Sequence, residues 1–308
     1  MSAQLAVTQV FNGLQFGVFL FLMSAGLTLI LGVMNFVNLA HGSLFMLGAY
    51  AAATVLDRTG SFVASVLAAA VAVGLLGLVL QLSLFRRLQN EEPLRQVLAT
   101  FGLTLFFNEL VRIIWGASPL YMQVPDLFSG TVDVLGVSYP AYRLLIVALG
   151  MVVAVLMWFL VHKTRIGMLI RAGATNRVTI ETLGVNIIAL NAAIFALGAC
   201  LAGFSGAIAG PLLSVQSGMG DPILILTLCV IVVGGLGSSK GAFVASLCVG
   251  LIDTAGRAFI PLIFRSMMDR SLANAAGPAV ASMLIYCIMA AVLALKPDGL
   301  FSPTRGNS

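Results

Sequence analysis

A succession of long apolar segments constrains this chain more than any other feature of its sequence. The apolar core of a bilayer is about 30 Å thick and takes about 20 helical residues to cross. By that measure the candidate spans are 10–33, 36–56, 61–84, 94–115, 141–161, 187–213, 223–237, 241–257 and 275–295. The segments at 223–237 and 241–257 are short enough for one of them to be a half-helix or broken helix, which gives eight to ten spans. Because lipid satisfies no backbone hydrogen bonds, the sequence predicts an all-α, polytopic transmembrane helical bundle.

The composition indicates a chain embedded in lipid throughout. Hydrophobic residues make up 60% of the 308 residues and charged residues only 9%, against roughly 25% charged in soluble domains. No stretch between the apolar segments is long enough for a separate core, so residues 1–308 are predicted to form a single transmembrane domain. The net charge of +5 comes from small basic groups between apolar segments. Such groups are typical of topology signals and not of a nucleic-acid surface.

The distribution of Lys and Arg predicts the orientation of the chain. Cytoplasmic connections are enriched in these residues, and both 84–96 and 162–186 are rich in them, whereas Gly116–Pro140 contains neither. The N-terminus is therefore expected outside and the C-terminus in the cytoplasm. Residues 257–274 disagree, because this connection should be external and yet contains Arg257, Arg265 and Arg270. Residues 1–56 carry no charged side chain, so the positive region of a cleavable signal is missing and the first span is expected to be retained.

The stretch 162–186 is too polar to span a membrane and has the pattern of short helices. Gly167 is expected to interrupt its start, Thr175 or Asn176 to cap a new helix, and Gly184 to end that helix in a left-handed conformation. Leu183 lies on the apolar edge of this amphipathic helix. Such a helix can dock in a groove of a partner protein or lie on the lipid surface, and the pattern leaves both open.

Polar residues inside apolar spans are functional candidates, with helix packing as the alternative. Asn35, Asn38 and His41 recur at i, i+3 and i+6 and are predicted to form a polar stripe on the second span, followed by Ser43. This stripe either lines a translocation pathway or provides hydrogen bonds between helices. Both explanations remain open.

Pairs of small residues predict close helix contacts. Gly13 and Gly17 form one such face on the first span, and Gly206 and Gly210 form another on the sixth. One face is expected to pack within the subunit and the other against a partner subunit. Two charged pairs, Glu109 with Arg112 and Asp253 with Arg257, have helical spacing and are expected to be structural.

Three segments resemble one known family. The segments NFVNLAHGSLFMLGAY at 35–50, TRIGMLIRAGATNRVTIETLGVN at 164–186 and VVGGLGSSKGAFVAS at 232–246 are similar to the branched-chain amino-acid ABC permeases of the LivH type, in the same order and across nearly the whole chain. The resemblance implies a transmembrane permease subunit of an ATP-driven ABC importer in the bacterial inner membrane. It also implies as partners a second permease of the LivM type, two ATP-binding subunits of the LivG and LivF types, and a periplasmic solute-binding protein.

The same resemblance implies that the stretch at about 162–186 contains the coupling helix seated on an ATPase subunit. The implied contact residues are Arg165, Gly167, Arg171, Asn176, Leu183, Gly184 and Asn186. Members of the family often have an acidic residue where this chain reads Ala174-Thr175-Asn176, so the salt-bridge partners of the loop are not defined. The implied solutes are branched-chain or other hydrophobic amino acids, or related small amphipathic solutes such as aromatic acids, amides or urea.

The sequence offers no candidates for catalysis or for a cofactor. Its two histidines, His41 and His162, have no further ligands near them in the sequence, and its four cysteines lack C-x-x-C spacing. The glycine-rich run before Lys240 lacks the Gly-Lys-Ser/Thr ending of a phosphate-binding loop. ATP hydrolysis is therefore expected on separate subunits. The alternative is a stand-alone secondary transporter or channel, but such carriers usually keep a carboxylate near the bilayer midplane, and the acidic residues here lie at the ends of the predicted spans or in connections.

Overall fold

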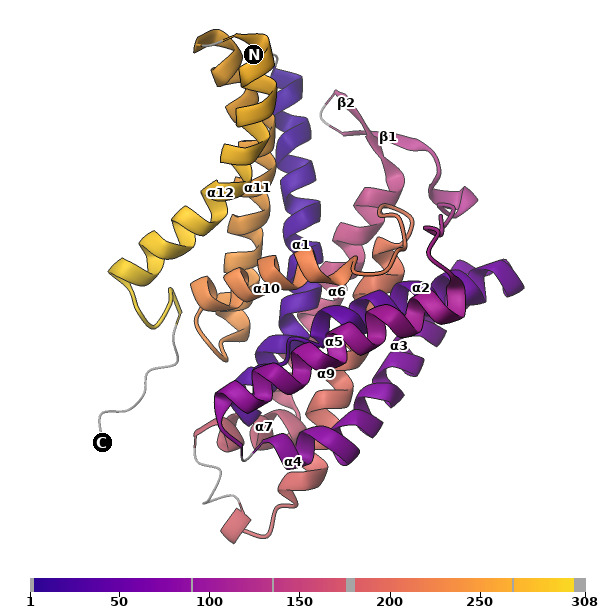
Figure 1. The fold of residues 1–308 in the computed structure, drawn as a ribbon, viewed down its shortest axis with the longest axis vertical. Helices are drawn as coiled ribbons and strands as arrows, with labels where there is room; N and C mark the ends of the chain where they lie inside the picture. Colours follow the sequence, from indigo (N-terminus) through magenta and orange to yellow (C-terminus); the bar gives the residue numbers. More distant parts are fainter. Residues whose placement is uncertain (1–2, 90, 135, 176–180, 268, 302–308) are drawn as a thin grey trace. The chain divides into compact units, whose positions relative to one another are not determined.

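The computed structural model describes residues 3–89, 91–134, 136–175, 181–267 and 269–301, and these residues are mainly helical (Figure 1). The α-helices are α1 (Ala3–Met34), α2 (His41–Thr59), α3 (Phe62–Leu80), α4 (Arg86–Leu88), α5 (Pro93–Trp115), α6 (Ala141–Lys163), α7 (Arg165–Thr175), α9 (Ile187–Ala209), α10 (Gly220–Gly234), α11 (Ser239–Met267) and α12 (Arg270–Leu295). A π-helical turn, Gln81–Phe85, joins α3 to α4, and a 3₁₀ turn, Asp126–Phe128, precedes the strands β1 (Thr131–Val134) and β2 (Val137–Pro140).

The helices confirm the predicted fold class. Within the described ranges, seven helices are long and apolar enough to cross a membrane: α1, α3 with its extension to Leu88, α5, α6, α9, α11 and α12. The helix α2 has 19 residues, and α10 has 15, so α10 extends only about 22 Å at 1.5 Å per residue. If α2 and α10 are added to these seven helices, the number of candidate spans lies within the predicted range of eight to ten. The molecule is a multi-pass membrane protein.

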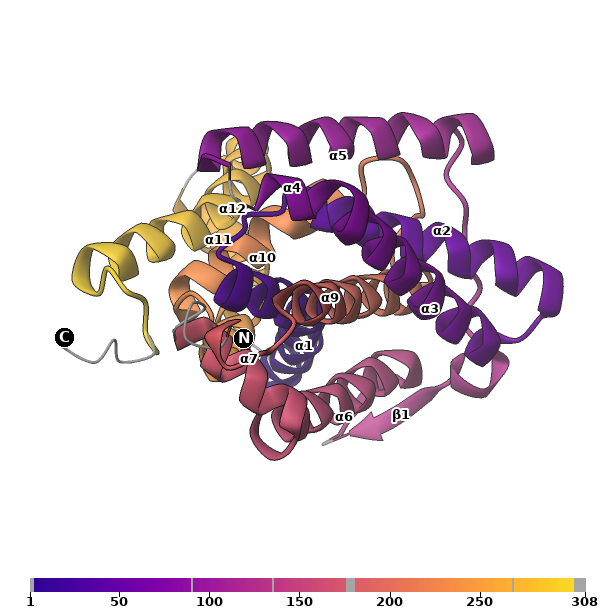
Figure 2. The ribbon, with the colours of Figure 1, turned by 90° about the horizontal axis from the view of Figure 1, so that it is seen from below.

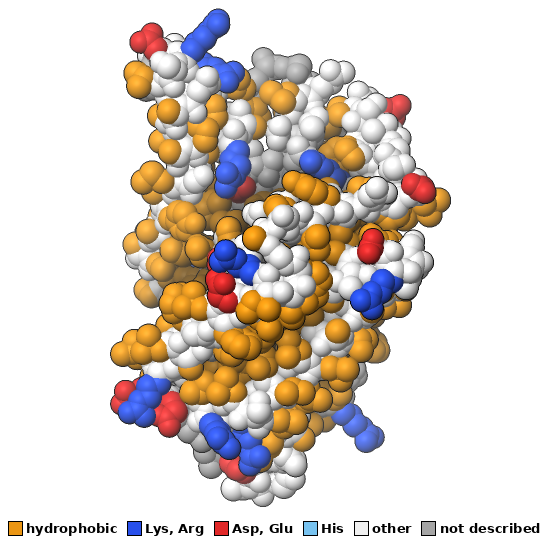
Figure 3. Space-filling model, turned by 45° about the vertical axis from the view of Figure 1, so that its right-hand side comes forward, with side chains coloured by type: hydrophobic (Ala, Val, Ile, Leu, Met, Phe, Trp, Pro, Cys, Tyr) orange, Lys and Arg blue, Asp and Glu red, His pale blue; other side chains and the backbone are white. Residues whose placement is uncertain are grey.

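The outward face of α3 shows which solvent surrounds this helix. Large apolar side chains recur every four residues along it, and each is at least 58% exposed: Val63, Leu67, Val71, Leu75 and Val79. The opposite face, which includes Ala69, Val73 and Gly77, is buried. A soluble helix has its polar side chains outside, so this inverted pattern fits a helix that faces lipid. Figure 3 shows hydrophobic side chains over much of the visible face, with charged side chains in small groups.

The described chain forms two compact units. The first, residues 22–124 and 153–226, is centred on α9, which packs against α2 and α3 (Figure 2). Glycines allow these helices to approach closely. A Cβ atom added at Gly48 of α2 would stand 2.3 Å from the carbonyl oxygen of Gly203 in α9, and one added at Gly77 of α3 would stand 2.4 Å from Ala199. These contacts are the small-residue packing expected between helices in lipid.

The second unit comprises residues 1–21, 125–152 and 227–308. In it α11 packs against α12, where Gly277 lies against Pro261 within the helix α11. The strands β1 and β2 form an antiparallel hairpin in which Thr131 lies opposite Pro140. The prediction of one membrane domain over residues 1–308 remains a prediction.

The second predicted span begins later than expected. The sequence predicted a helix from residue 36, but α2 begins at His41, and residues 35–40 are not helical. Asn35 has a left-handed backbone, with φ +51°, which ends α1. The side chain of Asn38 then accepts a hydrogen bond from the N–H of Ala40 at 3.0 Å. Asn side chains form such turns readily, and this turn delays the start of α2.

The expected short span at 241–257 is wrong, because α11 is 29 residues long and continues to Met267. Arg257 lies inside α11 and forms an ion pair with Asp253 at 2.8 Å on the same helix. Arg265 also lies in α11, and Arg270 is the first residue of α12. The predicted connection at 257–274 is therefore largely helical. Its positive charges, which disagreed with the predicted orientation of the chain, lie mostly in helices and not in a connection.

Candidate translocation and coupling sites

Buried polar groups gather at the start of α2. The side chains of Asn38, His41 and Ser43 are at most 1% exposed. His41 Nε2 lies 3.3 Å from the carbonyl oxygen of Met23 in α1, and because a carbonyl only accepts, Nε2 carries the proton in this contact. Three atoms, Nδ2 of Asn38, Nδ1 of His41 and Oγ of Ser43, have no hydrogen-bond partner within the part of the chain that the structure describes. Buried polar atoms without partners are costly, so these three require an explanation.

Asn35 is separated from the other members of the predicted polar stripe. It is exposed, and its N–H donates to the carbonyl of Leu31 at 3.1 Å at the end of α1. The prediction that Asn35, Asn38 and His41 share one helical face is wrong, because only His41 belongs to α2. Their role in a translocation pathway is not tested by this geometry.

The start of α10 lies against the start of α2. A Cβ atom added at Gly220 would stand 1.9 Å from the carbonyl oxygen of Gly42, and one added at Gly42 would stand 2.8 Å from the carbonyl oxygen of Gly220. Residues 210–219, which lead to α10, are held by an antiparallel bridge between Val215 and Leu120. Two helix N-termini therefore meet in backbone contact within one unit.

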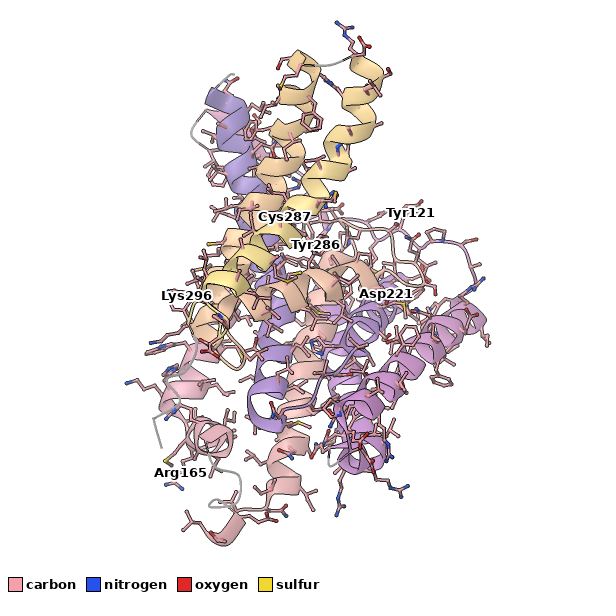
Figure 4. All side chains as sticks on the ribbon, turned by 60° about the vertical axis from the view of Figure 1, so that its left-hand side comes forward. Tyr121, Arg165, Asp221, Tyr286, Cys287 and Lys296 are labelled. Carbon is pink, nitrogen blue, oxygen red and sulfur yellow. The ribbon has the colours of Figure 1, made fainter. Side chains whose placement is uncertain are left out.

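Asp221, in the first turn of α10, was not among the candidates chosen from the sequence (Figure 4). It is half-buried, and the side chain of Asn108 in α5 hydrogen-bonds to its carboxylate. Ser217 holds the same region, since its Oγ donates to the carbonyl of Asn108 at 2.9 Å. The signal that could have identified Asp221 is an acidic residue in the short connection between the predicted spans 187–213 and 223–237.

The helices α6 and α7 are joined by a sharp turn built on Gly167. Contrary to the expectation that Gly167 interrupts a helix, it lies inside α7, where a Cβ atom would stand 2.2 Å from the carbonyl oxygens of Leu160 and Val161. Arg171, one turn later, donates to the carbonyl of Val161. Arg165 is exposed at the first position of α7 (Figure 4). The turn thus fixes α7 to the end of α6 and leaves Arg165 available for contact.

The last residues of the predicted coupling segment differ in their surroundings: some stabilise the local backbone, and one is exposed. Gly184 has φ +83°, and its N–H donates to the carbonyl of Glu181 at 3.0 Å, as expected for a residue that ends a helix. Asn186 is the N-cap of α9, where its side chain accepts from the N–H of Ala189 at 3.0 Å. Leu183 is 76% exposed. Asn176 and the cap predicted there lie outside the described residues.

All four glycines predicted for helix packing contact other segments of this chain. Gly13 and Gly17 of α1 lie against Leu251 and Leu247 of α11. In the other unit, Gly206 lies against Phe45 of α2, and Gly210 lies near the sulfur of Met122. Both faces therefore have contacts within the chain, and the expectation that one of them packs against a partner permease stays a prediction.

Asn12 is a hydrogen-bonding centre that joins three elements of the second unit. Its Oδ1 accepts from the hydroxyl of Tyr139 in β2 at 3.0 Å and from the guanidinium of Arg143 in α6. Burial raises the pKa of the Tyr139 hydroxyl, and the neighbouring Arg143 lowers it in part. The hydroxyl is therefore protonated at neutral pH and donates to Asn12. This arrangement fixes the hairpin to α1 and is structural.

Two ion pairs expected from the sequence are present within single helices. Arg112 pairs with Glu109 at 3.0 Å on the surface of α5, and Asp253 pairs with Arg257 in α11. Among the residues described, no group of three or more His, Cys, Asp or Glu side chains is placed to hold a metal ion.

Comparison with known proteins gives a consistent family relationship. The family described as "Branched-chain amino acid transport system / permease component" matches residues 9–293. The chain is 24% identical over 283 residues to the high-affinity branched-chain amino acid transport system permease protein LivH of Escherichia coli K12, covering 86% of this chain and 90% of that protein. It is 26% identical over 267 residues to the corresponding permease BraD of Pseudomonas aeruginosa, covering 80% and 85%.

A relative with a different printed solute also matches. The ribose import permease protein RbsC of Escherichia coli K12 is 29% identical over 256 residues, covering 80% of this chain and 75% of RbsC. No solved structure matches the chain.

Proposed function

Because the chain belongs to the family of permease components of branched-chain amino acid transport systems, we propose that it forms part of the membrane path of an ATP-driven ABC importer for branched-chain or other hydrophobic amino acids. The family is one of transport permease subunits and not of enzymes, and its members leave ATP hydrolysis to separate subunits. Related amphipathic solutes, such as aromatic acids, amides or urea, belong to the same proposal.

The observation that carries the proposed path is the set of polar atoms without partners at the start of α2. Asn38, His41 and Ser43 each retain a buried donor or acceptor that meets no other group of the described chain. Polar groups inside a membrane are retained where they have a function, and a passing solute would provide the missing partners. We assign these three residues to the translocation pathway and leave Asn35 at its rim.

The stretch 162–186 is proposed as the site of coupling to the ATPase. Arg165 and Leu183 are exposed and would contact the ATP-binding subunit directly. Gly167, Arg171, Gly184 and Asn186 would act through the shape of the segment, since each holds a turn or a cap. A rigid connection between α6 and α7 suits this role, because it passes a push on α7 directly to a membrane helix.

The proposed assembly contains a second permease of the LivM type, two ATP-binding subunits of the LivG and LivF types, and a periplasmic solute-binding protein. The N-terminus would lie outside and the C-terminus in the cytoplasm. The basic connections at 84–96 and 162–186 support this orientation. Alternating access of a path between the two permeases, driven by ATP, would then move solute from the binding protein into the cell.

Purification of the tagged chain from its native membrane, followed by mass spectrometry, tests the assembly. Recovery of two different ATP-binding subunits and a second permease supports the proposal. Recovery of one type of ATP-binding subunit and no second permease would replace the heteromeric assembly with a homodimer. A chain that is purified alone and carries solute in liposomes without ATP would support a secondary transporter or channel instead.

A further inference from the structure

The segments that lead into α2 and α10 have the same local design. In the first, Val37-Asn38 precedes Gly42, and in the second, Val215-Gln216 precedes Gly220, with the same spacing. Both form the same turn: the N–H of His41 donates to the carbonyl of Asn38 at 3.4 Å, and the N–H of Met219 donates to the carbonyl of Gln216 at 3.2 Å. The two helix N-termini then meet at Gly42 and Gly220. Half-helix N-termini that converge inside a membrane protein are favourable places for a charged solute group.

The start of α2 provides hydrogen-bond donors for an anion. The N–H groups of a first helical turn have no intrahelical acceptor, and within the part of the chain that the structure describes no side chain caps this helix at Ala40. Asn38 Oδ1 is bound to the N–H of Ala40, so its carboxamide lies over the helix start and its Nδ2 has no partner there among the described groups. Ser43 Oγ, in the same first turn, also has no hydrogen-bond partner in the described ranges. Both side chains are at most 1% exposed.

The start of α10 provides a negative charge, the carboxylate of Asp221. Asp221 Oδ2 lies over Gly218, 3.6 Å from the position that a Cβ atom would occupy. The N–H of Gly218 contacts the sulfur of Met46 in α2 at 3.3 Å. Met46 follows Ser43 by three residues and so lies on the same face of α2. Gly218 therefore contacts both the Asp221 carboxylate and Met46, which lies on the face of α2 that carries Ser43.

We propose that these two helix starts form a binding site for a zwitterionic α-amino acid. The solute carboxylate would be held by Ser43 Oγ, Asn38 Nδ2 and the N-terminus of α2, and the solute ammonium by Asp221. A neutral sugar has no charge to pair with Asp221, and a simple carboxylic acid leaves that carboxylate unpaired. This inference names the class of solute that the proposed importer carries, and it therefore rests on the proposed function.

Binding of radiolabelled leucine to the purified permease–ATPase complex, without the solute-binding protein, tests this site directly. Asp221→Asn and Ser43→Ala should each weaken leucine binding by at least about tenfold, because the first removes the negative charge opposite the solute ammonium and the second removes a hydrogen bond to the solute carboxylate. The matched control is Glu109→Gln, which removes an exposed carboxylate next to Asn108 on α5. The control should leave leucine binding unchanged.

A second ligand separates recognition of the ammonium from a structural role of Asp221. The wild-type complex should prefer leucine to 2-hydroxy-4-methylpentanoate, which has the same carboxylate and side chain but no ammonium. In the Asp221→Asn complex this preference should fall at least about tenfold, and Asp221→Glu should restore part of it. Equal weakening of both ligands, or an unchanged preference, would overturn the assignment of Asp221.

The wild-type complex distinguishes this inference from the proposed function. If the wild-type complex imports ribose but neither binds nor imports leucine-type amino acids, the proposed function fails before any variant is compared. If the wild-type complex imports leucine and the Asp221 and Ser43 variants bind it normally, only the zwitterion site is overturned.

Discussion

Gly167 of α7 lies directly against the carbonyl oxygen of Leu160 in α6, so that a Cβ atom there would stand 2.2 Å from that oxygen. Gly167→Ala should open the turn between the two helices, since backbone atoms cannot yield as a flexible side chain can. We expect a loss of roughly 1–3 kcal/mol in stability and a strong reduction in ATP-driven uptake. The measurements are thermal unfolding in detergent and uptake by the reconstituted complex.

Gly102→Ala is the control for this substitution. Gly102 lies in α5, and a Cβ atom there meets no atom of the described chain within 4 Å. Alanine favours a helix by about 1 kcal/mol over glycine, so this variant should keep both stability and uptake. If the two variants have the same stability and the same ATP-driven uptake, the α6–α7 turn is not important for either.

Gly184 separates backbone conformation from side-chain bulk. Its φ is +83°, and no atom of the described residues lies within 4 Å of an added Cβ atom. Gly184→Val should therefore reduce the coupling of ATP hydrolysis to transport through backbone strain of roughly 1–2 kcal/mol, with membrane insertion intact. Gly184→Asn should be milder, because Asn tolerates the left-handed region. Comparable loss of coupling in both variants would point to side-chain bulk and not to conformation.

Asn12 should be important for the stability of the unit that contains the hairpin. Asn12→Ala removes the acceptor shared by Tyr139 and Arg143, and we expect unfolding to become easier by about 1–3 kcal/mol. Asn12→Asp keeps an acceptor and gives Arg143 a charged partner, so it should retain most of the stability. Thermal unfolding of the two variants compares them, and a harmless Asn12→Ala would contradict the assignment.

Asp253 and Arg257 should be coupled in stability. The Asp253 side chain is only 7% exposed and depends on Arg257 for its charge partner. Arg257→Ala should destabilise the protein by roughly 1–3 kcal/mol, because it leaves a buried carboxylate without compensation. The double variant Asp253→Ala/Arg257→Ala should be more stable than Arg257→Ala alone. Strictly additive effects in this double-mutant cycle would show that the pair does not interact.

Much of the fold was predictable because apolar length is read directly from the sequence. The bounds of α5 and α6 lie within two residues of the predicted spans. The errors occurred where a local contact overrides composition. Asn38 delays the start of α2 through a turn, and α11 continues to Met267 through Arg257, which looked like a helix end but pairs with Asp253 on the same helix.

The candidate sites were predictable in part. The sequence identified His41, Asn38 and Ser43 as polar residues in an apolar region, but it placed the first two on one helical face. It could not show that Gly42 and Gly220 meet, because residues far apart in the chain carry no mark of their contact. Asp221 was missed for the same reason: at the edge of an apolar segment it looks like an ordinary span end until the start of α2 lies beside it.

ATP-driven uptake in proteoliposomes tests the central claim most directly. The purified complex of this chain with its ATP-binding subunits, supplied with the solute-binding protein and radiolabelled leucine, should accumulate leucine only when ATP is present. A non-hydrolysable ATP analogue should abolish accumulation. Leucine uptake by this chain alone, at the same rate with and without ATP, would contradict the account.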